Sequence, residues 1–449
     1  MSTDRRYDAL VPGRPGGSAA SRRRFLGTAA GAAVASAAVI GGIEAAGASP
    51  AQAQSASDPG WYDVTQSPYN AAGDGSTDDT TAIRAAIAAA QANAYGGVVY
   101  LPVGQYVVSA PLVVTASDIL ILGTGPLATL GASGCNDGKS TTIKPAAGWA
   151  PGGATQPACI LFDAVTAGAD LNRCGVERLA IAGSNLPSTT EMHGIATYGS
   201  VGAFGVTGCI VTSIANTSSC GITNTTSYSP GAQGNSYVRN LVQSVGGDGY
   251  DLASGDLTVE HCHAQQCGGN GFSITLSAGD TRITSCRSDE SGLNGFYINA
   301  PAGDDLGPVQ LANCTTQASQ NNGINIANTA DAEICPVYLT GCVFQGDGQN
   351  GGSNAGIRLS GPVAATITGC GVHINKTAAY PTGVPLQAIA TTSDGVAPPV
   401  MLSMLGGFYN AVYGLADVID APLVSDVRVY TYYGGQWDYN DTPKLTTSL

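Results

Sequence analysis

The chain repeats one short pattern between about Val176 and Gly371, a glycine followed by an apolar, a variable and an apolar residue, as in Gly249-Tyr250-Asp251-Leu252 and Gly271-Phe272-Ser273-Ile274. The other copies read Gly194-Ile195-Ala196, Gly221-Ile222-Thr223, Gly295-Phe296-Tyr297-Ile298, Gly323-Ile324-Asn325-Ile326 and Gly356-Ile357-Arg358-Leu359. Alternate side chains of an extended strand point to opposite faces. Each copy therefore predicts a short strand that buries its two apolar side chains and displays the variable one.

A second marker keeps step with the glycines and consists mostly of cysteines. It falls at Cys209, Leu241, Cys262, Cys286, Cys314, Cys342 and Cys370, and the last five are 24, 28, 28 and 28 residues apart. Self-similarity at a period of about 20–30 residues, built from short strands and Gly/Asn turns, is typical of a stacked solenoid. We therefore predict an all-β fold, a right-handed parallel β-helix.

The chain holds twelve cysteines. Residues that repeat once per coil stack on their counterparts about 4.8 Å apart along the axis, which predicts a column of buried thiols rather than disulfide bridges. Six cysteines lie off this column, and some of them could pair: Cys135, Cys159, Cys174, Cys220, Cys267 and Cys335. No CxxC spacing suited to a zinc site occurs. We expect no metal and no cofactor.

Residues 1–53 have the features of a targeting segment. Ser21-Arg22-Arg23-Arg24-Phe25-Leu26 fits a twin-arginine export signal, and Ala51-Gln52-Ala53 offers a cleavage site after an Ala/Gly-rich apolar run. Glu44 and the many small residues argue against a permanent membrane anchor. We predict a cleaved signal peptide over 1–53 and a secreted, extracellular mature protein.

The mature chain is strongly acidic. Removing residues 1–53 takes away six arginines and three acids, which leaves 12 basic and 29 acidic residues and a net charge of −17. That balance disfavours nucleic acid or anionic lipid as a partner and makes a polyanionic substrate less natural. We expect no nucleic-acid partner and no membrane association of the mature form.

Residues 54–110 predict a cap and a first coil. The run Ala72-Gly73-Asp74-Gly75-Ser76-Thr77-Asp78-Asp79-Thr80-Thr81-Ala82-Ile83 leads into an Ala-rich stretch with Ile83 and Ile87 four apart. This pattern predicts an amphipathic helix, capped by Thr77 or Asp78, that covers the open end of the solenoid. The acids of this run therefore belong to the cap.

The remaining residues predict the solenoid and its C-terminal end. We assign 111–429 to the parallel β-helix, with a Gly/Pro/Ala-rich insertion at about Ala146–Pro157 of the kind that walls a binding groove. Residues 430–449 hold five aromatic side chains within ten positions. We expect this tail to cover the last coil, and a platform for sugar rings is the alternative.

The cap run, followed by Gly96-Gly97-Val98-Val99-Tyr100-Leu101-Pro102 and Gly104-Gln105-Tyr106, resembles the N-terminal cap of the pectate-lyase-like superfamily. That group includes polygalacturonase- and rhamnogalacturonase-related proteins, mannuronan epimerases and phage tailspikes. The resemblance implies a right-handed β-helix with an N-terminal helical cap that acts on a polysaccharide or oligosaccharide. It also admits a homotrimer, in which a site would straddle two subunits.

Registering the coils on their glycines produces two columns. The outward residue two after the glycine runs Ala196, Thr223, Asp251, Ser273, Tyr297, Asn325 and Arg358, and the residue just before it runs His193, Cys220, Asp248, Asn270, Asn294, Asn322 and Ala355. The three asparagines predict an amide ladder that tolerates left-handed backbone.

Two departures from these columns suggest a site. Asp248 and Asp251 put two carboxylates on one coil, and paired carboxylates serve as general acid and as base or nucleophile in glycan cleavage. Four further side chains enter the same side and would position substrate: Tyr297, His193, Glu191 and Arg358. The alternative is that Asp248 merely replaces asparagine in the ladder and Asp251 is a solvated charge. A second polar patch at His261, His263, Asp289 and Glu290 reads most simply as a solvated corner.

The chain departs from the catalytic motifs of the families it resembles. Gly269-Asn270 stands where polygalacturonases carry an Asp-Asp pair, Leu293-Asn294 stands where they carry histidine, and no Arg-Ile-Lys follows. Asp251 matches the aspartate of the epimerase motif, but Ala253 and Thr275 replace its histidine and later acid.

Three functions therefore stay open. The first is a glycoside hydrolase or transglycosylase acting on a neutral or weakly charged glycan, with Asp251 and Asp248 as catalytic residues. The second is a polysaccharide lyase in which Tyr297 or His193 takes the proton and Arg358 stabilises the developing charge. The third is a non-catalytic glycan-binding or cell-surface protein.

Overall fold

The computed structural model describes residues 60–125, 139–225, 233–253, 255–275, 279–300, 306–328, 333–350, 354–374, 387–392, 400–411, 419–420 and 424–429. The chain divides into Met1–Ser55 and Ala56–Leu449, and all described residues belong to the second unit. The predicted signal peptide and the aromatic tail at 430–449 lie outside the described residues. In the part of the chain that is described, no helix has the length and apolarity needed to span a membrane.

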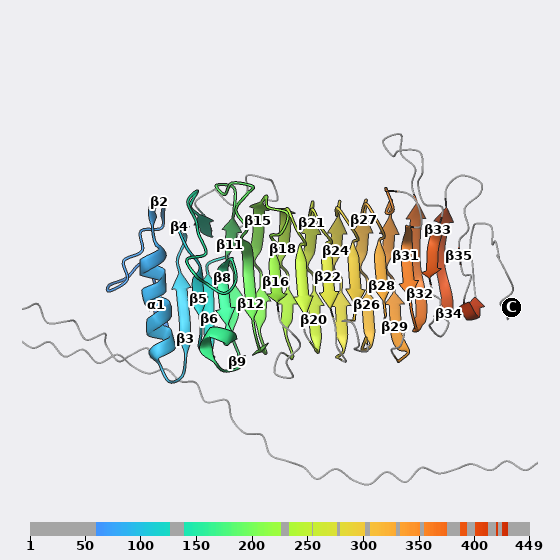
Figure 1. The fold of residues 1–449 in the computed structure, drawn as a ribbon, viewed down its shortest axis with the longest axis horizontal. Coiled ribbons are helices and arrows are strands. Elements are labelled where there is room, and N and C mark those ends of the chain that lie inside the picture. Colours follow the sequence, from blue (N-terminus) through green and yellow to red (C-terminus); the bar gives the residue numbers. More distant parts are fainter. Residues whose placement is uncertain are drawn as a thin grey trace, which may run out of the picture. The chain divides into compact units, whose positions relative to one another are not determined.

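The second unit is a right-handed parallel β-helix, which confirms the predicted fold class (Figure 1). One full coil consists of β19 (Tyr250–Ala253), β20 (Leu257–Glu260) and β21 (His263–Gln265), and the next begins with β22 (Phe272–Thr275). Every strand pairs in parallel with its counterpart one coil on, as Asp251 does with Ser273.

The repeated Gly-apolar-x-apolar segments form a sheet of eleven strands, which we call the groove sheet. Its strands are β5 (Leu112–Val114), β8 (Ala158–Asp163), β12 (His193–Tyr198), β16 (Ile222–Thr225), β19, β22, β25 (Phe296–Asn299), β28 (Ile324–Ala327), β31 (Ala355–Ser360), β33 (Gln387–Thr392) and β35 (Ile419–Asp420).

A second sheet supplies the other two faces of each coil. Its first face holds β1 (Trp61–Asp63), β3 (Gly97–Leu101), β6 (Ile119–Gly123), β10 (Gly175–Glu177), β14 (Gly205–Thr207), β17 (Ser236–Val238), β20, β23 (Thr281–Thr284), β26 (Val309–Ala312) and β29 (Cys335–Thr340). Its other face holds β2 (Asp74–Asp78), β4 (Gly104–Val108), β7 (Thr141–Pro145), β11 (Ala180–Ala182), β15 (Ile210–Ile214), β18 (Leu241–Val245), β21, β24 (Arg287–Asp289), β27 (Thr315–Gln317) and β30 (Val343–Gln345). The long strands β32 (Val363–Ile374) and β34 (Val400–Ala411) run through both faces and join them, and β36 (Val424–Val429) pairs with β34. A short pair, β9 (Leu171–Asn172) and β13 (Val201–Gly202), lies apart from both sheets.

The interior is filled by side chains that stack on their own counterparts. Tyr250, Phe272 and Phe296 follow one another in the groove sheet, with ring centroids 4.6 and 4.8 Å apart and planes within 9° of parallel. This spacing equals the distance between neighbouring strands. The apolar position after each glycine therefore builds a continuous column rather than separate contacts.

The recurring glycines are required by space and not by backbone angle. A Cβ added to Gly221 would lie 2.7 Å from the carbonyl oxygen of Gly249 and 2.3 Å from Val242 Cγ1, and one on Gly249 would lie 2.6 Å from the Gly271 oxygen. Neither glycine has a positive φ. Each glycine lets its coil approach the backbone of the next.

The predicted amide ladder is present. Asn270 Oδ1 accepts hydrogen bonds from the backbone N–H and Nδ2 of Asn294, at 3.1 and 2.9 Å, and Asn294 Oδ1 accepts the same two from Asn322. The expectation of left-handed backbone at these asparagines was wrong, since none of them has a positive φ. The left-handed residues stand instead directly before the cysteines, for example His261 and Ser285.

The predicted thiol column is also present, with one correction of register. All eleven described cysteines are free and buried. Leu241 pairs with His263, so Asn240 and not Leu241 occupies the position next to Cys262. The Asn240 side chain accepts from the Cys209 N–H at 2.9 Å and donates to the Val206 oxygen at 2.8 Å.

We expect a thiol reagent to leave these eleven cysteines unmodified in the native protein and to modify them once guanidinium unfolds it. Burial is the reason, since it raises the pKa of Cys209 to about 12 and withholds the reactive thiolate. Mass spectrometry after alkylation reads the result. A reductant should leave the unfolding midpoint unchanged, and a lower midpoint on reduction would reveal a stabilising disulfide instead.

The helix α1 (Thr80–Ala92) lies against the first coil, as predicted. Its buried face includes Ile83 and Ile87, and it packs on β1, β3 and β5. Asp78 accepts from the Thr80 N–H at 2.9 Å, while the Asp79 carboxylate accepts from the N–H groups of Ala72 and Gly73. These acids hold the cap together. A second, short helix, α2 (Ala164–Ala167), follows β8.

Candidate functional site

The outward column predicted from the repeats exists in the groove sheet. Thr223 pairs with Asp251, Asp251 with Ser273, and Ser273 with Tyr297. The column continues through Asn325 to Arg358. Because neighbouring strands are about 4.8 Å apart, these side chains form one row along the axis of the β-helix.

Asp251 lies on β19 in a half-buried position. Thr223 Oγ1 donates a hydrogen bond to its Oδ2 at 3.4 Å. Burial raises the pKa of Asp251 to about 6, the nearby Asp248 charge adds to this, and hydrogen bonds from Thr223 and Ser273 oppose it. The carboxyl group is therefore poised to exchange a proton close to neutral pH.

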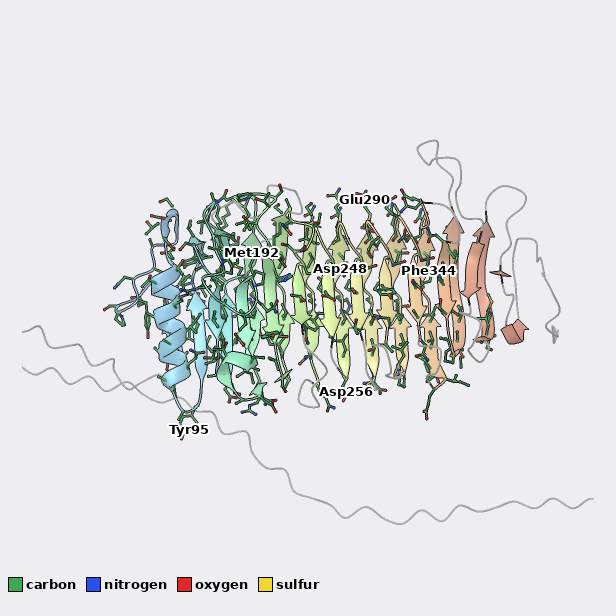
Figure 2. The ribbon with its side chains drawn as sticks, in the orientation of Figure 1. Tyr95, Met192, Asp248, Asp256, Glu290 and Phe344 are labelled. Atoms are coloured by element: carbon green, nitrogen blue, oxygen red, sulfur yellow. The ribbon has the colours of Figure 1, made fainter. Side chains whose placement is uncertain are left out.

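Asp248 lies in the turn before β19, near the middle of the stack (Figure 2). Its Oδ1 accepts from the Asn270 N–H at 2.5 Å and from Asn270 Nδ2 at 3.2 Å. Asp248 thus occupies the first position of the amide ladder, as expected in the alternative in which it replaces an asparagine there. Gly269 leaves room for it, because a Cβ there would lie 2.1 Å from Oδ1.

The two carboxyls are nevertheless coupled. Burial raises the pKa of Asp248, while hydrogen bonds from Asn270 and Ser273 lower it. The Ser273 hydroxyl thus lowers the pKa of both carboxyls. Asp248 has the stronger donors, so it holds its charge more readily than Asp251. Two carboxyls whose surroundings favour different protonation states are the arrangement that acid and base chemistry needs.

The other predicted residues fall into two groups. Tyr297 and Arg358 are half-buried and lie in the same row as Asp251, two and four strands further on. His193 is buried in the column before the glycines, where its Nδ1 accepts from the Cys220 N–H at 3.0 Å. Glu191 is exposed, and its Oε1 lies 4.0 Å from His193 Nε2.

His193 is a neutral side chain at physiological pH, because burial lowers its pKa to about 4. Its Nδ1 is already an acceptor, so the single ring proton lies on Nε2. This imidazole therefore has no free lone pair with which to remove a proton from a substrate.

Three residues of the row were not singled out from the sequence. Thr223 and Ser273 contact Asp251, and Asn325 lies between Tyr297 and Arg358. The Asn325 Oδ1 is buried and accepts no hydrogen bond from the described residues. Their positions in the outward column indicate that they belong to the row. They were not predicted as site residues because only charged and aromatic side chains were considered.

The second polar patch is an ion network on another face. His263 Nε2 lies 2.9 Å from Asp289 Oδ2, and Arg287 Nε lies 2.6 Å from the same oxygen. Burial acts to raise the pKa of Asp289, but the two partners together lower it, and they occupy its carboxylate. Within the described ranges, no group of three or more acidic, histidine or cysteine side chains is arranged to hold a metal.

Comparisons with known proteins agree with the fold. The A-module of mannuronan C-5 epimerase AlgE4 from Azotobacter vinelandii matches with a TM-score of 0.53 and 16% identity, over 86% of this chain and 100% of that one. The enzymatically active domain of tailspike protein 2 from bacteriophage CBA120 matches with a TM-score of 0.54 and 14% identity, over 82% of this chain and 52% of that one. Such low identities show similarity of fold. No curated protein sequence matches significantly.

A sequence model for rhamnogalacturonase A/epimerase, pectate lyase-like proteins matches residues 63–297. That span runs from β1 to Tyr297, includes every predicted site residue except Arg358, and covers more than half of the chain. The protein therefore belongs to the rhamnogalacturonase A/epimerase, pectate lyase-like family.

Proposed function

We propose that this protein is an exported enzyme that hydrolyses or transfers glycosidic bonds in a neutral or weakly charged glycan. The observation that carries the proposal is a pair of half-buried carboxyls on one coil, Asp251 in the outward row of the groove sheet and Asp248 in the turn before the same strand. Asp251, whose pKa is about 6, is the general acid. Asp248 is the base or nucleophile.

The reaction follows from these roles. Asp251 donates its proton to the glycosidic oxygen as the bond from the anomeric carbon to that oxygen breaks. In a single-step hydrolysis, a water molecule forms the new bond to the anomeric carbon and its proton passes to Asp248. In a two-step hydrolysis, Asp248 first bonds to the anomeric carbon; water then displaces the Asp248 carboxylate, and the proton of that water passes to Asp251, which lost its own proton in the first step. In transfer a sugar hydroxyl takes the place of water. No oxidant or metal is required.

The comparisons support a glycan as substrate. The family carries the name of a rhamnogalacturonase, and the structural neighbours are named as a mannuronan epimerase and an enzymatically active tailspike domain. The net charge of −17 for residues 54–449 favours a neutral or weakly charged chain over a polyuronate. Of the two bases that a lyase could use, His193 is disfavoured because it has no free lone pair, which leaves Tyr297.

The test is to incubate the mature protein, residues 54–449, with fructans, α- and β-glucans, pectins and alginate, and to read the products by mass spectrometry. A hydrated product supports the hydrolase and an anhydro or transferred product the transglycosylase. An unsaturated product supports a lyase and overturns the proposal. Binding to one glycan without any product overturns it in favour of the non-catalytic alternative.

The pH dependence offers a second prediction. We call the glycan that the protein cleaves in this test the responsive glycan. A general acid works while protonated, so kcat/KM on the responsive glycan should fall about tenfold per pH unit above pH ~6. Because the Ser273 hydrogen bond lowers the pKa of Asp251, Ser273→Ala should move this alkaline limb to higher pH. A limb that stays in place in Ser273→Ala would mean that another group donates the proton.

A further inference from the structure

We infer that the glycan groove is single-ended, closed just beyond Asp251 on its N-terminal side and open along β25, β28 and β31, so that the enzyme attacks its substrate from a chain end. This inference rests on the proposed function of the same row. It concerns how a glycan enters the row, which the acid pair alone leaves open.

The N-terminal part of the groove sheet is covered. Leu161 on β8 and Ala196 on β12 occupy the same outward column as Asp251, yet both are 0% exposed. They form an apolar cluster outside the main core, and Ala154 of the predicted insertion packs against it together with Tyr198 and Val113. Outward-facing apolar side chains without exposure must lie beneath another part of the chain.

Hydrogen bonds hold this covering segment in place. Thr155 Oγ1 donates to Asp163 Oδ2 at 2.6 Å, at the end of β8. The Ala150 N–H donates to the Ser109 oxygen at 3.0 Å, and the Ala146 N–H donates to the Val108 oxygen at 2.8 Å. The segment is thus attached to the β-helix both where it leaves β7 and where it passes over β8.

Asp251 is the first accessible position after the covered part. Thr223, between Ala196 and Asp251, is only 2% exposed, whereas Asp251 is half-buried. Asp251 lies two strands from Ala196, or about 10 Å. The acid pair therefore lies at the closed end of the row, with little length for sugar units on that side.

The opposite side of Asp251 has the features of a binding track. Half-buried Tyr297, Asn325 and Arg358 follow at two, three and four strands, which extends the row by about 19 Å. Asn325 lies between Tyr297 and Arg358 in this row, and its side-chain amide can hydrogen-bond a sugar hydroxyl. Tyr297 offers a ring to stack on a sugar.

A chain lying on this track can reach the acid pair only with its terminus. Cleavage then releases a short product from the closed end, and the shortened chain advances. A polymer whose two ends are both chemically capped, or a cyclic glycan, would therefore not be a substrate.

The experiment follows a polymer of the responsive glycan over time. We expect reducing ends to accumulate while viscosity stays high, a single short product to dominate from the start, and capped or cyclic forms to resist. Early viscosity loss with a ladder of fragments, or equal cleavage of the cyclic form, overturns the single-ended groove and leaves the proposed function intact.

A matched pair of variants tests the track. Asn325→Leu should raise KM about tenfold for chains that reach β28 and leave the shortest substrate unaffected, since a hydrogen bond between the amide and the sugar is lost. Gln310→Leu is the control, because Gln310 is exposed on β26 of the other sheet. An equal effect of Asn325→Leu on short and long substrates contradicts the track.

Binding separates this inference from the proposed function. If no glycan is cleaved, amide hydrogen exchange of Asp251→Asn can be compared with and without the oligosaccharide that it binds most tightly. The strands whose exchange slows are those that the oligosaccharide covers. Protection limited to β19, β22, β25 and β28 supports a single-ended groove without catalysis. Protection centred on another face, or no binding to any glycan, overturns the inference and the proposed function together.

Discussion

Asp251→Asn should lower kcat on the responsive glycan by about a thousandfold and change KM little. The amide keeps the shape of the carboxyl and can still accept from Thr223, but it has no proton to donate to the leaving oxygen. Initial rates over a range of substrate concentrations give the two constants, and circular dichroism confirms that the variant is folded.

The control for this variant is Asp280→Asn. Asp280 is another aspartate of the β-helix, with its side chain 46% exposed beside Arg282, and it lies outside the outward row. Its substitution should leave kcat within about twofold of the unchanged enzyme. If Asp251→Asn cleaved the glycan as fast as the unchanged enzyme, the acid pair would not be the catalytic site.

Gly221→Ala should lower the free energy of unfolding by about 3 kcal/mol. The added Cβ would meet both Val242 Cγ1, at 2.3 Å, and the carbonyl oxygen of Gly249, at 2.7 Å. Neither can withdraw, because Val242 is a fully buried core side chain and the oxygen accepts the Ile222 N–H. Chemical denaturation measures the difference.

Gly205→Ala is the matched control. Gly205 begins β14, has no positive φ, and a Cβ there would meet nothing within 4 Å. Alanine should be neutral or slightly stabilising, since it reduces the freedom of the unfolded chain. Equal destabilisation by both substitutions would mean that the glycine column reflects something other than close contact between coils.

The repeats were sufficient to predict the coil, because each makes the same contact with the next. The glycine spacing, the stacked aromatic rings after Gly249, Gly271 and Gly295, and the asparagine ladder all follow from one side chain meeting its own counterpart about 4.8 Å away. Such contacts are visible in a sequence as a column. Asp251 could be placed on the outer face for the same reason.

Features that break the period could not be predicted. Asn240 takes the place of a cysteine in the thiol column, so counting to the next apolar residue led to Leu241, one position too far. The role of Ser273 depends on the burial of two carboxyls, which no pattern of residue types reveals. The covering of Leu161 and Ala196 depends on where a non-repeating insertion lies, and spacing carries no information about that.

A structure of Asp251→Asn with an oligosaccharide of the responsive glycan would show directly whether these carboxyls form the active site. We predict a glycosidic oxygen within hydrogen-bond distance of residue 251, the carboxylate of Asp248 beside the anomeric carbon or its attacking water, and the rest of the glycan directed toward Arg358. A glycan bound on another face, such as the one that carries His263 and Arg287, would contradict it.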